Sequence, residues 1–424
     1  MKTIVPRLRK LKNGVRVAWM ENPASTACAF EVFFTVGSRH ESEDIMGASH
    51  FLEHLMFKGT KKRPNAQAVS QDLDRYGAEY NASTGKDHTS YYVKIEADRA
   101  LHAMEVLHDM LANATLKPTD IQRERGVIIE EINMYEDNPQ SYMSMLLDKM
   151  SFGEHPLGRE IAGTRDVIRE ITPKRLRAHR DQYYAPERMV IAVAGRIPKE
   201  AWAFLESSFG SWKRASKSSE AREEVFEAKS MQGVRLSLVQ KKIEQVQLGL
   251  SFSTFPMLDP RQDASRLLAV ILGGTMSSRL FSEVREKRGL CYDISAGRSS
   301  YADTGVFRIV AGLEKGSLQA AIKVIWAELG KMSTKLVSAQ ELRRAKDYVR
   351  GKFYLGFEDP LTQADWYGDQ LCYRETWRTP EERMKGLEAV TPAQIRAVAK
   401  ELFDRKNYAV SVVGPYESAE ETRG

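Results

Sequence analysis

Two histidines and a glutamate on one helical turn are the residues of this chain best suited to chemistry. His50 and His54 stand four positions apart in the pentad His-Phe-Leu-Glu-His. A helix places both imidazoles on one face, close enough to hold one metal ion. Glu53 lies between them, and its carboxylate can reach a water molecule on that ion. The pentad therefore predicts a metal centre, with a pair of surface histidines on an amphipathic helix as the alternative.

A catalytic zinc ion takes three protein ligands and leaves one position open. All eight histidines lie at or before His179, which favours a third ligand in the first half of the chain. The best source of a carboxylate is the segment 119–135, TDIQRERGVIIEEINMY. It follows Pro118 and starts with a possible capping box of Thr119 and Gln122, so it is predicted to begin a helix.

The helical phase of this segment separates two adjacent glutamates. At about 100° per residue, Glu131 lies within the apolar stripe that contains Ile128, whereas Glu130 lies on the far face. Glu124 lies on nearly the same face as Glu131. Carboxylates in an apolar stripe are costly unless a positive group meets them. We therefore assign Glu131 as the metal ligand and Glu124 as a partner that orients a ligand histidine. A solvated carboxylate remains the alternative for each.

Three stretches resemble, in order and spacing, the pitrilysin/insulinase family of zinc peptidases with the inverted H-x-x-E-H motif. They are GASHFLEHLMFKGT, GAEYNASTGKDHTSYYV and RERGVIIEEINMYEDNP. The resemblance extends over essentially the whole chain and points to the short two-domain branch that includes the β subunit of mitochondrial processing peptidase and its bacterial homologues. It implies one Zn²⁺ per chain, held by His50, His54 and Glu131, with Glu53 as the base that activates water for peptide-bond hydrolysis.

Composition excludes several other classes of protein. A chain of 424 residues suits two domains of about 200 residues each. The net charge of +6 is small, and basic residues alternate with acidic ones, so no nucleic-acid partner is expected. No stretch approaches about 18 apolar residues, so no membrane span is expected. Three cysteines without a CxxC pair and the absence of a signal-peptide pattern predict a cytoplasmic protein, although a mature organellar protein would look the same.

An internal repeat divides the chain. The segment 171–195 aligns without a gap to 390–414, and each copy predicts a helix that starts at Thr-Pro and a buried strand that ends in glycine. We therefore predict two homologous α+β halves, 1–212 and 231–424, joined by a charged, serine-rich linker at 213–230. The resemblance implies a mostly antiparallel sheet in each half, covered on one side by helices. Strands are predicted at 15–20, 29–36, 90–95 and 246–252.

The second half lacks the metal ligands, since Arg266, Ala269 and Val270 stand near the positions that correspond to the pentad. In the family, an arginine and a tyrosine of this half reach substrate at the zinc of a first-type domain, and Arg285 and Tyr292 resemble that pair. An arginine can bind substrate carbonyls, and a tyrosine hydroxyl can donate to a developing oxyanion. Ordinary surface residues are the alternative.

The resemblance also implies where substrate lies. It assigns Asn81 and Ala82, in the segment Tyr80–Thr84, to a sheet edge that accepts the peptide as an added strand. A structural asparagine in a turn is the alternative.

The family encloses its substrate in a chamber of four such domains, and this chain supplies two. Because the chain carries both the zinc half and the Arg/Tyr half, we expect a homodimer, with a heterodimer containing a homologous, motif-poor subunit as the alternative. The predicted function is a zinc endopeptidase acting on peptides or unfolded segments. A presequence-processing subunit and a non-catalytic structural homologue stay open.

Overall fold

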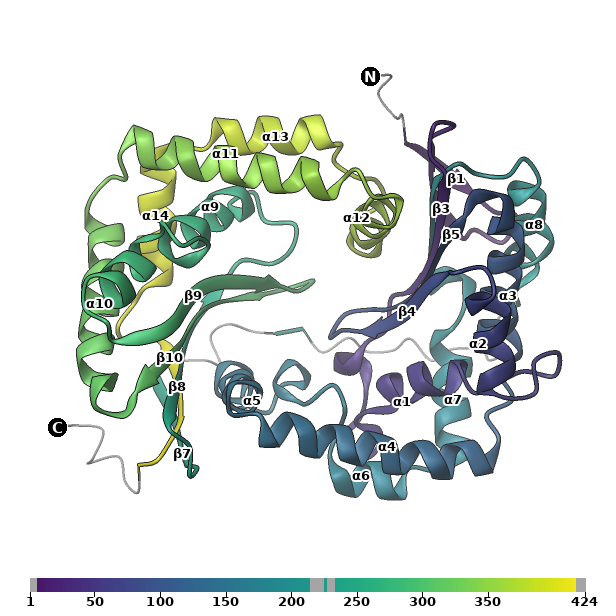
Figure 1. The fold of residues 1–424 in the computed structure, drawn as a ribbon, viewed down its shortest axis with the longest axis horizontal. Helices are drawn as coiled ribbons and strands as arrows, with labels where there is room; N and C mark the ends of the chain where they lie inside the picture. The colour runs from purple at the N-terminus through teal and green to yellow at the C-terminus, as the bar shows by residue number, and fades with distance from the viewer. Residues whose placement is uncertain (1–5, 214–224, 227–232, 417–424) are drawn as a thin grey trace. The chain divides into compact units, whose positions relative to one another are not determined.

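The computed structural model describes residues 6–213, 225–226 and 233–416, which form two compact units (Figure 1). The first unit consists of Met1–Ile132, Arg159–Glu223 and Tyr354–Arg378. The second unit consists of Asn133–Gly158, Glu224–Phe353 and Thr379–Gly424. These units depart from the contiguous halves 1–212 and 231–424, because each takes one segment from the other half of the chain. Most of the predicted linker, 213–230, lies outside the described residues.

The sheet of the first unit has six strands in the order β1-β2-β6-β3-β5-β4. Neighbouring strands are antiparallel, except that β2 and β6 run parallel. Strand β4 stands at the edge of this sheet, where, among the residues that the structure describes, it pairs only with β5. The strands are β1 (Arg7–Lys10), β2 (Arg16–Glu21), β3 (Ala27–Phe34), β4 (Glu79–Thr84), β5 (Thr89–Glu96) and β6 (Met189–Gly195).

Helices cover this sheet. Those of the first unit are α1 (Ala48–Met56), α2 (Ala66–Asp74), α3 (Ala100–Asn113), α6 (Arg165–Glu170), α7 (Pro173–Tyr183), α8 (Ala201–Ser207) and α12 (Pro360–Tyr373). Helix α4 (Pro118–Asp137) starts in the first unit and ends in the second. Its start at Pro118 lies one residue before the predicted capping box.

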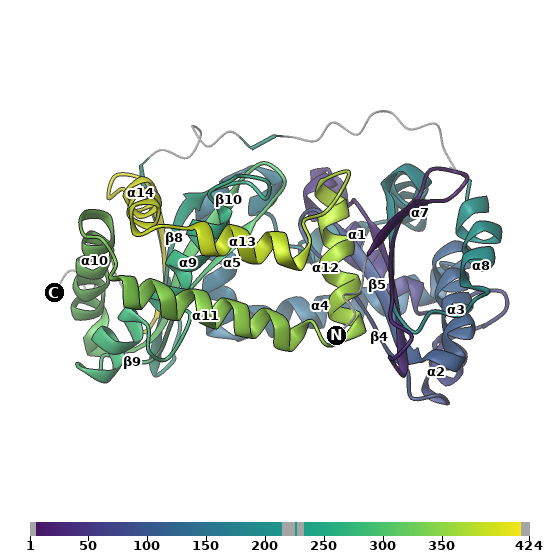
Figure 2. The same cartoon turned by 90° about the horizontal axis from the view of Figure 1, so that it is seen from above.

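Both faces of the sheet are covered, so the prediction of helices on one side only is wrong for this unit. Every residue of β6 is buried. Ile191 and Val193 belong to the core that α1, α3 and α8 help to form, whereas Ala192 and Ala194 pack with α12. Figures 1 and 2 show α12 on one face of the sheet and α3 and α8 on the other. The continuous apolar run of β6 is typical of a strand buried on both faces.

Helix α12 approaches the sheet through a glycine. A Cβ atom added to Gly368 would lie 2.1 Å from Cε2 of Phe33, a β3 residue that is fully buried. Tyr367 and Leu371 pack into the same cluster. Only a residue without a side chain therefore allows this contact between the helix and the sheet.

The sheet of the second unit has five strands in the order β7-β11-β8-β10-β9, with β7 and β11 parallel and the other pairs antiparallel. The strands are β7 (Val234–Gln240), β8 (Gln245–Thr254), β9 (Cys291–Ser300), β10 (Gly305–Glu314) and β11 (Tyr408–Gly414). The helices are α5 (Pro139–Phe152), α9 (Gln262–Gly273), α10 (Leu318–Thr334), α11 (Ala339–Gly356), α13 (Pro380–Ala389) and α14 (Pro392–Leu402), with a π-helical segment at Phe281–Glu286.

This second sheet repeats the arrangement of the first. Met143 and Leu147 of α5 pack with Ala409 and Val413 of β11, while α9, α10 and α14 contribute to the separate, larger core. Each unit therefore contains a mostly antiparallel sheet with helices on both faces, which confirms the α+β class with two sheets. The four predicted strands correspond to β2, β3, β5 and β8, with ends shifted by a few residues. Among the described residues, no helix combines the length and apolarity needed to cross a membrane.

Candidate metal centre

Helix α1 begins at a glycine that its surroundings require. Gly47 has φ of +91°, and a Cβ atom added there would lie 2.6 Å from the carbonyl oxygen of Ala162. The buried carboxylate of Glu41 accepts hydrogen bonds from the backbone N–H groups of Gly47 and Ser49, each at 2.7 Å. Because the first N–H groups of a helix have no partner within it, Glu41 fixes the start of the helix that carries His50 and His54.

The structure brings His50, His54 and Glu131 together, with one potential ligand atom of each within 4.8 Å of the others. Oε2 of Glu131 lies 3.5 Å from Nε2 of His50 and 3.5 Å from Nε2 of His54. Bonds of about 2.0–2.1 Å in tetrahedral geometry imply about 3.4 Å between zinc ligands. The residues therefore fit a zinc ion in both ligand type and spacing. No other group of this kind occurs in the part of the chain that the structure describes.

Glu124 contacts one ring nitrogen of His54 and leaves the other facing Glu131. Oε2 of Glu124 lies 3.2 Å from Nδ1 of His54, so Nδ1–H can donate to it while Nε2 faces Glu131. Lys58, two residues after α1, forms an ion pair with the other Glu124 oxygen at 2.8 Å. The Glu124 side chain is only 3% exposed. The positive partners that a carboxylate at this buried position needs are therefore a histidine and a lysine.

The two histidines differ in their electrostatics. Burial and the neighbouring His54 lower the pKa of His50 to about 4, so His50 is neutral at physiological pH. Burial also lowers the pKa of His54, but hydrogen bonds to Glu124 and Glu131 outweigh it and raise the pKa to about 9. A metal ion that binds this site must therefore displace a proton from His54.

Glu53 points to the edge strand of the sheet. Its Oε2 accepts a hydrogen bond of 2.5 Å from Oγ1 of Thr84, the last residue of β4. Burial raises the pKa of Glu53, although the Thr84 hydroxyl opposes the shift. A carboxylate with a raised pKa beside a metal group is suited to accept and return a proton.

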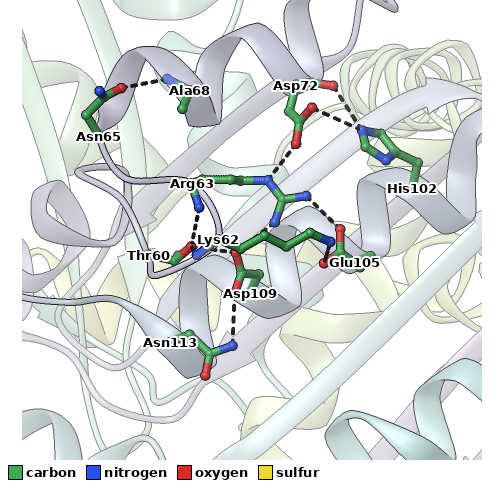
Figure 3. A network of polar contacts seen from close by, with 10 residues as sticks. All are labelled: Thr60, Lys62, Arg63, Asn65, Ala68, Asp72, His102, Glu105, Asp109 and Asn113. Carbon is green, nitrogen blue, oxygen red and sulfur yellow. Dashed lines mark hydrogen bonds and ion pairs between the residues drawn. The ribbon is translucent and has the colours of Figure 1, made fainter.

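The loop after α1 is fixed by one buried arginine (Figure 3). The Arg63 guanidinium donates to Asp72 of α2 at 2.6 Å and to Glu105 and Asp109 of α3 at 2.6 and 2.7 Å. The Thr60 hydroxyl also donates to Asp109, at 2.6 Å. These contacts connect the end of the histidine-bearing helix to two other helices of the first unit.

The remaining predicted site residues belong to other elements of the fold. Asn81 and Ala82 lie in β4, so they belong to a strand rather than a turn. Arg285 and Tyr292 belong to the second unit, at the π-helical segment and the start of β9. Cζ of Arg285 lies 5.4 Å from the centre of the Tyr292 ring, and Tyr292 is 74% exposed. Their role toward substrate stays a prediction.

Sequence reasoning missed Glu41, Lys58 and Thr84. Each contacts its partner because the tertiary fold or a turn brings the two together. None of the three belongs to a sequence motif that is known for a catalytic or metal-binding role. Lys58 offered one signal, because it follows His54 by four positions and a buried Glu124 needs a cation nearby.

Comparisons with known proteins match most of the chain. The model of the insulinase family (peptidase family M16) matches residues 16–165, and that of the peptidase M16 inactive domain matches residues 170–349. An uncharacterized zinc protease of Bacillus subtilis is 33% identical over 95% of this chain and 97% of its own length. One of Streptomyces coelicolor is 34% identical over 98% of this chain and 91% of its own. The crystal structure of a protease from Helicobacter pylori has the same fold, with a TM-score of 0.91 at 23% identity, over 97% of this chain and 100% of that one.

Proposed function

Because the chain belongs to the insulinase family of peptidases, M16, we propose that it is a zinc-dependent endopeptidase that hydrolyses peptides or unfolded segments. The convergence of His50, His54 and Glu131 on one point, beside the carboxylate of Glu53, is the observation that carries the proposal. The names of its relatives in Bacillus subtilis and Streptomyces coelicolor as zinc proteases support it.

The roles of the residues follow from their positions. His50, His54 and Glu131 would hold the ion, and Glu124 would keep the His54 tautomer that leaves Nε2 free. When bound, zinc supplies Lewis acidity, which polarises a peptide carbonyl and makes water a better nucleophile. Glu53 takes one proton from the attacking water, and the resulting hydroxide adds to the carbonyl carbon. The C–N bond then breaks as Glu53 returns the proton to the amine, which yields one new carboxyl end and one new amino end.

The test compares Glu53→Gln with the wild-type protein. The glutamine has the same size but is a poor base, so we expect unchanged zinc content by mass spectrometry and near-complete loss of cleavage of a peptide library. Glu130→Gln, on the exposed side of α4, serves as the control and keeps its activity. A chelator should abolish cleavage by the wild type. Cleavage by Glu53→Gln at the wild-type rate would exclude Glu53 from the reaction.

The edge strand β4 is the proposed docking place for substrate. Pairing with the free side of β4 would bind the peptide through its main chain, alongside Asn81 and Ala82. Main-chain pairing accepts many sequences, which suits an enzyme that cleaves unfolded segments. A peptide with N-methylated amides next to its cleavage site should therefore bind more weakly than its unmethylated counterpart.

Arg285 and Tyr292 complete the proposal as substrate-binding residues of a homodimer. The Tyr292 hydroxyl would donate to the developing oxyanion, and Arg285 would bind substrate carbonyls. Light scattering gives the oligomeric state. Co-expression of Glu53→Gln with Tyr292→Phe then tests whether Tyr292 acts on the zinc site of its own chain or on that of the partner chain. If Tyr292 acts on the zinc site of the partner, the mixed dimer regains one intact site; if it acts within its own chain, activity stays low.

A further inference from the structure

The hydrogen bond between Thr84 and Glu53 joins a strand to the proposed base. Thr84 ends β4, the edge strand, and Glu53 lies on α1. An ionised carboxylate accepts hydrogen bonds and cannot donate, so the Thr84 hydroxyl is the donor in this 2.5 Å contact. It is the one hydrogen bond that Glu53 makes to a side chain among the described residues.

This contact fixes one edge of the carboxylate. Oε2 of Glu53 accepts the hydrogen bond from the Thr84 hydroxyl, and the Thr84 backbone also hydrogen-bonds to Glu53, while a carboxylate has further lone pairs with which to accept a proton from water. A glutamate has three rotatable side-chain bonds, and without a fixed partner its carboxylate samples several orientations. Proton transfer requires the base to lie within hydrogen-bond reach of the proton, so a fixed carboxylate raises the rate.

A second contact strengthens the link between β4 and α1. Tyr80, in the same strand, stacks on Phe57, the residue that follows α1, with ring centres 6.4 Å apart. The strand is thus attached to the histidine-bearing helix near both of its ends, while its outer edge is free within the sheet.

We propose that Thr84 is a positioning residue: its hydroxyl orients the carboxylate of Glu53 and ties that orientation to the strand that receives the peptide. This inference rests on the proposed function, because it assumes that Glu53 is the base.

The test uses Thr84→Val, which removes the hydroxyl with little change of shape, and Thr84→Ser, which keeps it. We expect Thr84→Val to lower kcat roughly 10- to 100-fold with KM and the zinc dissociation constant unchanged, and Thr84→Ser to retain most of the activity. The control is Thr89→Val, directly opposite Thr84 on β5, whose hydroxyl donates to the carbonyl oxygen of Val36. Its expected effect is a lower Tm with unchanged kcat.

A second readout does not depend on activity. In the metal-free protein, Thr84→Val should lower the Tm in the wild-type background but not in the Glu53→Ala background, because the partner of the hydroxyl is already missing there. Equal shifts in both backgrounds would overturn the inference, as would a Thr84→Val enzyme with wild-type kcat. If instead the wild type shows no chelator-sensitive cleavage, the proposed function itself fails.

Discussion

One step along a helix separates a candidate metal ligand from a surface residue. Glu131 and Glu130 are neighbours in α4, but the carboxylate of Glu131 reaches both histidines whereas Glu130 is exposed. The period of 3.6 residues fixes this difference, so it is visible in the sequence once the apolar stripe is located.

Replacement of each glutamate by alanine should therefore have opposite outcomes. Glu131→Ala removes one of the three candidate ligands, and under the proposed function we expect the purified protein to contain no zinc and to show no activity. Glu130→Ala should keep both. Metal analysis after dialysis measures the difference, and zinc loss in Glu130→Ala alone would reverse the assignment.

A smaller effect is expected at Glu124, which contacts the candidate ligand His54 and is not itself one of the three candidate ligands. Glu124→Ala removes the acceptor for Nδ1–H of His54 and leaves Lys58 without its partner in this pair. Loss of such a partner lowers metal affinity by about 10- to 100-fold in other zinc sites. Competition with a chromophoric chelator measures the dissociation constant. An unchanged constant would show that the orientation of His54 does not depend on Glu124.

Helical spacing made the metal group predictable, since His50, His54 and Glu131 follow from two amphipathic patterns. Glu41 and Thr84 could not be found in this way. Glu41 contacts the start of α1 through a loop, and Thr84 reaches Glu53 only because β4 ends beside α1. Such contacts form between segments that the tertiary fold brings together. The spacing of residue types along one segment does not predict which other segment it will meet.

At the scale of elements, the Arg63 cluster connects three segments: the loop after α1, α2 and α3. The Arg63 side chain is 4% exposed, and Asp109 is 8% exposed, so the charges compensate one another away from water. Without Arg63, Asp109 stays buried and loses its ion-pair partner, whereas Asp72 and Glu105 are each 32% exposed and Glu105 keeps its ion pair with Lys62.

Arg63→Met should lower the free energy of unfolding by about 3–5 kcal/mol at pH 7. Burial raises the pKa of Glu105 and of Asp109, but hydrogen bonds outweigh it, including those from Arg63, and hold both below their ordinary values. This stabilisation is present above the unfolded pKa of about 4 and is lost as the pH falls through the folded values. The difference between the two proteins should shrink below about pH 4 in urea unfolding curves. A stability difference that does not change with pH would contradict an ionic origin of the stabilisation by Arg63.

The contact between α12 and β3 gives a second prediction at this scale. Gly368→Ala should destabilise the protein by about 1–3 kcal/mol, because the new methyl group meets the ring of Phe33. Gly351→Ala in α11 is the matched control: its methyl group meets nothing within 4 Å, so alanine should be neutral or favourable in the helix. Thermal unfolding distinguishes them. Equal Tm values for the two variants would mean that Phe33 or the sheet shifts enough to accommodate the methyl group.

The strands were predictable because each has a short apolar run between turn residues. The helix on the second face of the first sheet, α12, could not be predicted to pack there. The buried run of β6 indicates that something covers both faces, but α12 is far away in sequence and no local pattern connects it to β6.

For the whole molecule, the repeat predicts two similar halves, yet a repeat does not tell which sheet a given helix covers. In the structure, α5 packs on the second sheet and α12 on the first. The contiguous halves are therefore not the units that bury their own apolar surfaces.

A fragment of residues 1–212 should consequently fail to fold by itself. It contains the candidate metal ligands and the whole first sheet but lacks α12, so Phe33, Ala192 and their neighbours lose their cover. We expect aggregation or binding of a hydrophobic dye, and recovery of a soluble protein on co-expression with 213–424. A monomeric 1–212 fragment with a cooperative unfolding transition would refute this expectation.

The need for α12 to cover the first sheet also affects folding during biosynthesis. The ribosome synthesises β6 long before α12 (Pro360–Tyr373). One apolar face of the nascent first sheet therefore stays exposed to solvent until α12 has been synthesised. A premature stop codon anywhere between these two points would leave every candidate zinc ligand in place, and we expect its product to expose that face of the sheet.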